Sequence, residues 1–465
     1  TLTSIPTHPP PTLIMNRIIV FVACFLLGVT FAAADAGTDN DIATLNYALT
    51  LERLEAAFYA KGQSQFNQAQ FTSAGYANGA YDYFSLVAAH EAAHVKTISD
   101  TITQLGGTPV PACTYSFDAS GFSTVADYVN TALTLESTGV SAYDGALNAF
   151  TSETLMQVAA TIATIEARHT SYLSTLTGTS PFPDSLDTAK TPSDIVEAAK
   201  SFFVSCPYNL TSAAAAVIIR PTGVATTSTR DAAKPSSQKP ASNTVYTQEQ
   251  FNNDLVALNY ALTLEHLEAE FYNAGAARFS QSDFEAAYPG KGASYFTQFG
   301  LIKDHENAHV TALTNTINGR GGSAVPVCTY NFTAAKIPTI QDYVATARLL
   351  ENTGVSAYDG AANTFTDTGL QQVAATIVTV EARHAAFLDG IVNATGAIPS
   401  NAFDTATAPG DIVAAVLASG LVTQCPYALT GPVKPSTLNS AGSTSPSAFV
   451  LAAVWISFTL AFFRA

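Results

Sequence analysis

The sequence predicts an all-α protein that consists of two tandem four-helix bundles. Three observations lead to this prediction. The chain contains a long internal repeat, each copy holds four segments with apolar residues at helical spacing, and glutamates and histidines recur at matching positions. The hydrophobic fraction of 47% and the mean hydropathy of +0.18 also indicate a folded chain with a sizeable core.

The internal repeat spans whole domains rather than short solenoid units. Residues 45–52 return as 258–265, residues 139–146 as 354–361, residues 166–169 as 381–384, and residues 206–208 as 425–427. The spacing between matching segments grows along the chain, so the loops changed length while the helices kept their register. We therefore expect two duplicated domains, at 35–209 and 247–428, joined by a Ser/Thr/Pro/Ala-rich linker at 210–246.

Four long helices are expected in the first copy, followed by a shorter fifth helix at 193–204. The long helices are predicted at residues 41–60, 81–105, 125–150 and 155–176. Gly106 and Gly107 end the second helix, and an irregular crossover follows at 110–121, with its counterpart at 325–337 in the second copy. One long crossover in the middle of the bundle is typical of the ferritin-like variant of the four-helix bundle.

The second and fourth helices each carry a glutamate followed three residues later by a histidine, a spacing that places both side chains on one helix face. Lone glutamates on the first and third helices lie in phase with apolar neighbours, so all these side chains are expected to point into the core. The set is Glu52, Glu91, His94, Glu136, Glu166 and His169, and it returns as Glu265, Glu306, His309, Glu351, Glu381 and His384.

Four carboxylates and two imidazoles in one core need a reason, because unpaired buried charges are costly. Two divalent cations per domain would remove that cost, and mixed carboxylate and imidazole ligands suit iron or manganese. We therefore predict two Fe or Mn ions in each domain, with zinc less favoured. The alternative is that the carboxylates bind only one another or water.

Further polar residues flank the predicted ligands and are candidates for supporting hydrogen bonds. They are Glu55, His90 and Tyr143 in the first copy, and Glu268, His305 and Tyr358 in the second. The two glutamates lie one turn after the first-helix ligands. They are interpreted as alternative ligands, as supporting groups or as carboxylates at the rim of the site. The two tyrosines either bond near the site or are ordinary core residues. His266 fits no pattern and is expected at the surface.

These residues resemble those of the secreted fungal ferritin-like domain family, the stress or late-sexual-development proteins, which have plant desiccation-related proteins as relatives. The resemblance covers nearly all of residues 40–208 and 253–427. It implies that the glutamates of the Glu-x-x-His pairs bridge two metals, that the other two glutamates bind terminally, and that each histidine binds one metal. His90 and His305 depart from bacterioferritins, which have an acidic residue there. A tandem, anchored chain is also poorly suited to cage assembly, so iron storage is not expected.

The two ends of the chain predict an extracellular address. Residues 1–14 look like translated leader, and residues 15–34 have the basic start, apolar stretch and small-residue cleavage site of a signal peptide. A polar spacer at 429–447 and a hydrophobic tail at 448–465 have the layout of a GPI-attachment signal, with a plain membrane anchor as the alternative. We expect a secreted protein held by a lipid anchor at the cell surface or in the cell wall.

Cysteine and asparagine patterns agree with secretion. Four cysteines remain after the predicted signal peptide, and their repeated spacing predicts the disulfides Cys113–Cys206 and Cys328–Cys425. N-glycosylation sequons begin at Asn209, Asn331 and Asn393.

The formal net charge of −16 argues against nucleic-acid binding, which needs basic patches. The expected partners are metal ions, and membrane contact is expected only through the lipid anchor. The two halves are also candidates to pack together as an intramolecular pseudo-dimer.

Several functions remain open at this point. Residues 90–94 and 305–309 also match the His-Glu-x-x-His helix of zinc peptidases, although that reading leaves most of the other candidate ligands unexplained. The bundles could also be a non-enzymatic scaffold of a surface or stress protein, since a fold does not fix a function. Within the enzyme reading we expect a di-iron or di-manganese oxidoreductase that oxidises metal or handles dioxygen or peroxide. The sequence identifies no catalytic residue and no substrate.

Overall fold

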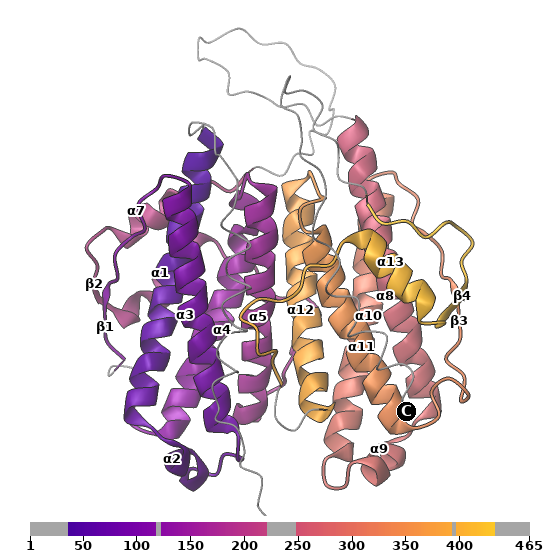
Figure 1. The fold of residues 1–465 in the computed structure, drawn as a ribbon. Helices are drawn as coiled ribbons and strands as arrows, with labels where there is room; N and C mark the ends of the chain where they lie inside the picture. Colours follow the sequence, from indigo (N-terminus) through magenta and orange to yellow (C-terminus); the bar gives the residue numbers. More distant parts are fainter. Residues whose placement is uncertain (1–35, 118–121, 221–247, 393–396, 433–465) are drawn as a thin grey trace, which may run out of the picture. The chain divides into compact units, whose positions relative to one another are not determined.

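Each half of the described chain forms a bundle of four long helices, as the sequence predicts (Figure 1). The computed structural model describes residues 36–117, 122–220, 248–392 and 397–432. The first bundle contains α1 (Ala36–Gln65), α3 (Ala80–Gln104), α4 (Val125–Ala146) and α5 (Glu153–Thr177). The second contains α8 (Gln248–Arg278), α10 (Gly292–Gly319), α11 (Ile340–Ala361) and α12 (Thr368–Val392).

Short elements that the sequence analysis did not predict extend both bundles. Each connection between the first two long helices contains a short helix, α2 (Gln68–Ser73) or α9 (Gln281–Ala287). Each crossover, expected to be irregular, contains a two-residue strand, β1 (Thr114–Tyr115) or β3 (Thr329–Tyr330). These strands pair antiparallel with β2 (Phe203–Ser205) and β4 (Val422–Gln424), near the end of each half.

Several boundaries differ from the expected ones, and α1 extends beyond the predicted 41–60 at both ends. The third helix gives way to a 3-10 turn at Leu147–Ala149 instead of continuing to residue 150. The fifth helix of the first half, α6 (Pro192–Ala199), ends five residues before the predicted residue 204, because a 3-10 turn at Lys200–Phe202 and then β2 follow it. Its counterpart in the second half is α13 (Pro409–Ala418), which precedes β4. The segment predicted as linker begins with α7 (Leu210–Ala215), which packs against α1 and α6.

Both predicted disulfides are present, and each joins the crossover of one half to the end of the same half. The Cα atoms of each pair are 4.3 Å apart. Cys113 directly precedes β1 and Cys206 directly follows β2, so the disulfide and the small sheet hold the same two segments together. Such a covalent link restricts the unfolded chain and stabilises the fold.

Some sequence predictions fall outside the described residues, namely the signal peptide, the GPI-signal tail and Asn393. Of the other two sequon asparagines, Asn209 is exposed and Asn331 is partly buried. No helix within the described ranges is long and apolar enough to cross a bilayer.

Local sequence fixes where the site-bearing helices begin. Thr124 and Asp127 form a capping box at the start of α4, and Thr339 and Asp342 repeat it at the start of α11. The buried Asp41 of α1 accepts hydrogen bonds from the backbone amides of the two residues that precede α5, at 2.6 and 3.0 Å. These bonds fix the start of α5 relative to α1, and therefore the height of its Glu-x-x-His pair in the bundle.

The core of each bundle has two apolar layers with the polar residues between them. In the first half, one layer is rich in aromatic side chains, including Phe58, Phe84 and Tyr128. The other layer is mainly aliphatic and includes Leu49 and Ile102. Along each long helix the conspicuous glutamates and histidines lie between residues of these two layers, so the site is enclosed at mid-height of the bundle.

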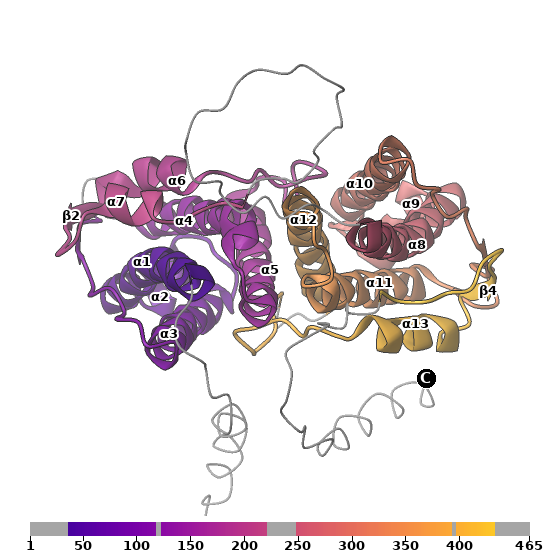
Figure 2. The same ribbon diagram turned by 90° about the horizontal axis from the view of Figure 1, so that it is seen from above.

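The two bundles contact each other through α5 and α12, which lie side by side in Figure 2. A small apolar cluster includes residues from both halves: Val140, Ala167, Val355, Ala382 and Ala385. Small side chains at this contact let the helices approach closely, while the two arginines that follow the alanines, Arg168 and Arg383, are also buried there.

Candidate metal centre

The structure brings the six predicted ligands of the first half together in two overlapping groups. Glu52, Glu91, His94 and Glu166 form one group, and Glu91, Glu136, Glu166 and His169 form the other. Within each group the potential ligand atoms lie within 4.8 Å of one another. Glu91 and Glu166 belong to both groups, so the arrangement has two positions that share two carboxylates.

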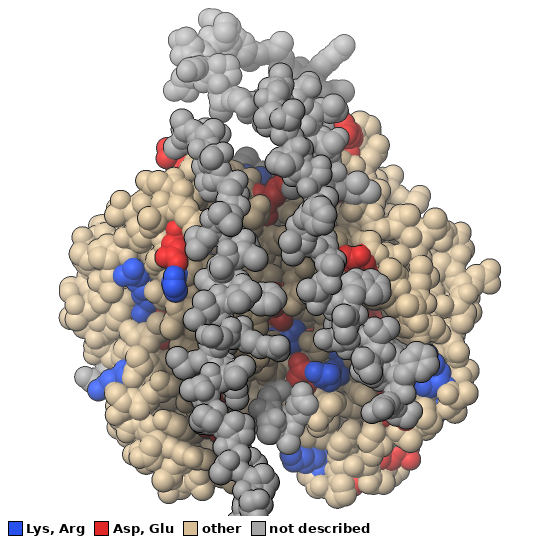
Figure 3. All heavy atoms as spheres, viewed as in Figure 1, with Lys and Arg blue, Asp and Glu red and all other residues tan. Residues whose placement is uncertain are grey.

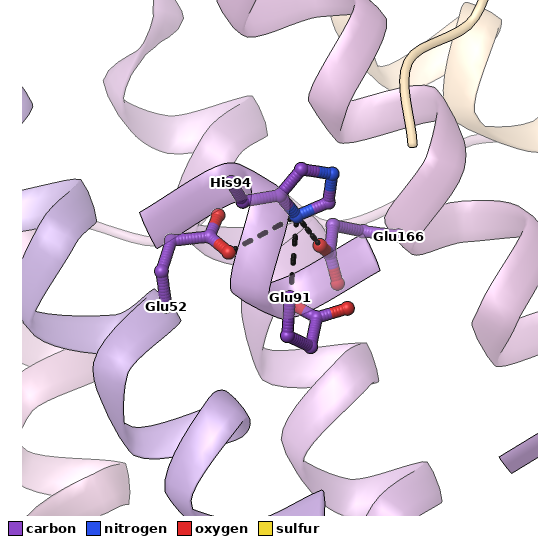
Figure 4. A group of neighbouring side chains, drawn as sticks. All are labelled: Glu52, Glu91, His94 and Glu166. Atoms are coloured by element: carbon purple, nitrogen blue, oxygen red, sulfur yellow. Dashed lines mark hydrogen bonds and ion pairs between the residues drawn. The ribbon is translucent and has the colours of Figure 1, made fainter. Parts of the chain in front are cut away.

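Each histidine turns its Nδ1 atom toward the carboxylates. Figure 4 shows His94 with Nδ1 facing three glutamates, at 3.1 Å from Glu52, 3.4 Å from Glu91 and 3.3 Å from Glu166. The Nδ1 atom of His169 lies 2.9 Å from Glu136 and 3.4 Å from Glu91. The i, i+3 spacing on α3 and α5 produces this convergence, as the sequence analysis expected.

The second half repeats the geometry with its own six residues. Its groups are Glu265, Glu306, His309 and Glu381, and Glu306, Glu351, Glu381 and His384. His309 Nδ1 lies 3.1 Å from Glu265 and 3.1 Å from Glu381. His384 Nδ1 lies 3.1 Å from Glu306 and 3.2 Å from Glu351. The duplicated sequence pattern therefore corresponds to two duplicated sites.

The shared glutamates carry buried oxygens that need partners. All twelve candidate ligands are at most 1% exposed. Neither oxygen of Glu91, Glu166 or Glu381 has a hydrogen-bond partner among the described residues. The same is true of one oxygen of Glu306. Buried carboxylate oxygens without donors are rare in folded proteins, and cations between them would satisfy them. The donor set therefore fits a pair of metal ions in each half.

Burial raises the proton affinity of the shared glutamates. It raises the pKa of Glu91 and Glu166 well above 4.5, and it also raises the pKa of Glu306 and Glu381. Burial alone would lower the pKa of His94, but the neighbouring Glu52 and Glu91 raise it well above its usual range. The shared carboxylates therefore favour their protonated form in the metal-free protein.

Tyrosines donate hydrogen bonds to the glutamates that belong to only one group. Tyr143 donates to Glu52, and Tyr358 donates to Glu265. Hydrogen bonding near the site was one of the two roles open for these tyrosines. A second pair was not singled out in this role: Tyr59 donates to Glu136, and Tyr272 donates to Glu351 at 2.5 Å. Tyr59 follows Glu52 by seven residues, two helical turns, so helical spacing was the signal available for it.

The remaining candidates surround the same centres. Glu55 is buried beside them but belongs to neither ligand group, and burial raises its pKa well above 4.5. Gly139 leaves space for it, because a Cβ atom there would lie 3.0 Å from Glu55 and 3.4 Å from Glu166. Glu268 and Gly354 repeat this arrangement in the second half. His266 lies away from both sites and, contrary to expectation, is only 9% exposed, since it packs against the crossover near the Val325 carbonyl.

His90 and His305 lie against the histidines of α5 and α12, which are His169 and His384. His90 Nδ1 lies 3.0 Å from His169 Nε2, and His305 Nδ1 lies 3.1 Å from His384 Nε2. Burial lowers the pKa of His90 and of His305 to about 3, so both rings are neutral. Neither ring belongs to a ligand group found among the described residues, which leaves the zinc-peptidase pattern without its first histidine ligand.

Charged side chains are sparse on the face of the molecule drawn in Figure 3, where most of the coloured surface is uncharged. The chain has only 12% charged residues, yet twelve candidate ligands, eight of them glutamates, are buried in its cores.

Removing one tyrosine bond should weaken the centre without dismantling it. We expect Tyr143→Phe to increase metal loss from the first half by roughly 10–100-fold, because Glu52 loses its fixed orientation. The measurement is the rate of metal transfer to a chelator. Tyr47→Phe is the matched control, since Tyr47 is buried but its hydroxyl has no hydrogen-bond partner among the described residues. Equal rates for the two variants would contradict this role of Tyr143.

The fold and the sites together define a class of protein: a helical bundle whose core holds buried carboxylate and histidine groups that could hold metal. The family model described as Ferritin-like domain matches the chain twice, at residues 40–179 and 253–394. The chain therefore belongs to the ferritin-like domain family and contains two copies of the domain. The comparison with curated proteins finds no significant match.

Proposed function

We propose that each half holds two iron or manganese ions and that the protein is an extracellular metal-dependent oxidoreductase or metal-binding protein. In the first half, the proposed bridging ligands are Glu91 and Glu166. Glu52 with His94, and Glu136 with His169, would complete the two positions; the second half would use the equivalent residues. The observation that carries this proposal is the overlap of two ligand groups on the buried carboxylates Glu91 and Glu166, whose oxygens have no hydrogen-bond partner within the part of the chain that the structure describes.

The surroundings of the histidines support metal binding through Nδ1. The Nε2 atom of His94 lies 2.6 Å from the carbonyl oxygen of Ala402, so Nε2 carries the proton and donates it. This bond leaves the Nδ1 lone pair free on the side of the carboxylates. His169 has its Nε2 against the neutral His90, which can accept the corresponding hydrogen bond.

Iron or manganese in such a site supplies one-electron redox chemistry toward dioxygen or peroxide. The shared glutamates of the chain hold the protons that accompany this redox chemistry. Because burial raises the pKa of the shared glutamates, they hold a proton more tightly than ordinary glutamates, and metal binding would displace that proton. The tyrosine donors keep the other glutamates oriented, and the two apolar layers exclude bulk water.

The test is to load the protein with Fe²⁺ or Mn²⁺ under nitrogen and then add dioxygen or hydrogen peroxide. We expect oxidation of the metal or loss of the oxidant in wild type, measured by absorbance and by an oxygen electrode. The double variant Glu91→Gln/Glu306→Gln should show neither. If wild type and the double variant react at the same rate, the scaffold function is favoured. Purified protein that contains zinc, with peptidase activity lost in Glu91→Gln, would instead favour the zinc-peptidase function.

The extracellular part of the proposal rests on the chain ends, the sequons and the two disulfides, which suit an oxidising compartment. A role in stress or development, and a fungal origin, rest on the family resemblance alone. Release of the protein from cells by a phosphatidylinositol-specific phospholipase is the expected result for a GPI anchor. Retention after this treatment would favour a plain membrane anchor.

A further inference from the structure

Two loops cross between the halves, and each reaches the centre of the other half. The loop between α5 and α6, residues 178–191, belongs to the first half, and its Ser185 carbonyl accepts a hydrogen bond from His309 Nε2 at 2.6 Å. Residues 397–408, which precede α13 in the second half, place the Ala402 carbonyl 2.6 Å from His94 Nε2. In Figure 1 the segment that precedes α13 extends across to α5. His94 of α3 and His309 of α10 therefore each donate a hydrogen bond to the backbone of the other half.

Apolar side chains anchor both loops in the opposite half. Phe182 is fully buried in the core cluster of the second half, with its ring centroid 4.8 Å from that of His384. Ile398 is buried in the core cluster of the first half. Phe403 places its ring edge-on to His94, with the centroids 5.4 Å apart. These loops thus form part of the wall of the other half's core.

An ion pair between a partly buried aspartate and a buried arginine holds each loop in place. Asp404 bonds to Arg168 at 2.7 Å, and Asp187 bonds to Arg383 at 2.7 Å. The backbone amides of the same two aspartates also donate across the contact, to Thr161 and Thr376 at 3.1 and 3.0 Å. Because Arg168 and Arg383 directly precede the ligands His169 and His384, each latch lies beside the centre that its loop covers.

We propose that each metal centre is completed by the other half: the 178–191 loop caps the second centre, and the 397–408 loop caps the first. The Ser185 carbonyl orients His309, and the Ala402 carbonyl orients His94. The caps also close the outer wall of each site. Asp187 and Asp404 are positioning residues for the caps. This inference rests on the proposed metal function. It explains why the duplicated domains are joined in one chain, since neither centre is complete without its partner domain.

The test reads one centre at a time in the full chain. In the background Glu306→Gln/Glu381→Gln, only the first half should retain metal. Asp404→Asn and Asp187→Asn are then compared as a matched pair by the rate of Mn²⁺ transfer to a chelator. We expect Asp404→Asn, a change in the second half, to speed metal loss from the first centre by about 10–100-fold. Asp187→Asn should leave this rate within about twofold. In the mirror background Glu91→Gln/Glu166→Gln, the two effects should exchange.

A second readout does not depend on metal. In the metal-free chain with all ligands intact, Asp404→Asn should expose His94, and Asp187→Asn should expose His309, to carbethoxylation mapped by mass spectrometry. Phe182→Leu and Ile398→Val give the same comparison if an aspartate variant fails to fold. Each substitution acting on its own half, or neither acting on either, would overturn the proposal. If wild type binds no metal yet the labelling pattern appears, the proposed function fails while the reciprocal caps stand.

Discussion

Glu91→Gln is expected to remove both metal ions from the first half while it stabilises the metal-free protein at neutral pH. Glu91 belongs to both ligand groups, so its loss affects both positions at once. The loss of affinity should exceed the roughly 10–100-fold typical of removing a supporting residue, because a direct ligand disappears. Metal analysis after dialysis measures it. The second centre, which has its own Glu306, should keep its metal.

The effect on the metal-free protein has the opposite sign. Burial raises the pKa of Glu91 in the folded state above 4.5, so its stabilising contribution is complete below pH 4.5 and is lost as the pH rises through the folded-state pKa. Glutamine resembles the protonated form and loses nothing. The stability gain of the variant should therefore be near zero below pH 4.5 and should grow above it, by up to about 1.4 kcal/mol per pH unit.

Thermal and urea unfolding of the metal-free proteins from about pH 4 to about pH 8 would measure this gain, because the range starts near the ordinary glutamate pKa of roughly 4.3 and extends well above it. The matched control is Glu197→Gln, because Glu197 is 70% exposed and pairs only at the surface with Lys200. Its stability should follow wild type at every pH. A stability gain for Glu91→Gln that does not change with pH would show that burial does not raise the pKa of the Glu91 carboxyl.

Gly145→Ala is expected to produce the largest loss of stability from a single added methyl group. A Cβ atom at Gly145 would lie 1.7 Å from the backbone oxygen of Lys190, where the 178–191 loop returns to α4. The Lys190 amide also donates to Ser141 at 3.0 Å, so the loop cannot move without breaking this bond. We expect a loss of about 1–3 kcal/mol or more. Gly360 meets the Thr407 carbonyl in the same way, so Gly360→Ala should behave alike.

The same variant should also loosen the cap over the second centre, because the displaced loop carries Ser185. Chemical unfolding measures the stability, and metal transfer from the second half measures the cap. Gly300→Ala is the control, since Gly300 lies within α10 and an added Cβ would meet nothing within 4 Å. It should stabilise the chain by about 0.5–1 kcal/mol. If Gly145→Ala is as stable as Gly300→Ala, the close approach of the loop to α4 is wrong.

Helical periodicity and duplication were enough to predict the long helices and the convergence of the glutamates and histidines. Both signals are local: Glu91 and His94 share a face because of the helix repeat, and the second copy confirms the order. The disulfides followed from repeated cysteine spacing. The change from α6 to β2 within the predicted fifth helix could not be predicted, because β2 depends on pairing with a strand about ninety residues away in sequence, as in the Thr114 to Ser205 pair.

The caps could not be predicted for a similar reason. Nothing in the sequence around Ser185 or Ala402 indicates that their carbonyls face histidines more than a hundred residues away in the other half. Backbone acceptors leave no mark on residue type. What repeats visibly between the two loops is Asp187-Thr188-Ala189, which returns as Asp404-Thr405-Ala406 and includes neither Ser185 nor Ala402. Likewise, Tyr59 and Tyr272 look like ordinary core residues until their hydroxyls are seen to donate to Glu136 and Glu351.

The central claim is that each half holds a pair of metal ions between its shared glutamates. The most direct test is metal content combined with anomalous X-ray diffraction on the full chain reconstituted with Mn²⁺ or Fe²⁺. The account predicts two ions in each half, one near His94 and one near His169, with the equivalent pair near His309 and His384. Less than one ion per chain after reconstitution, or ions bound away from Glu91, Glu166, Glu306 and Glu381, would contradict it.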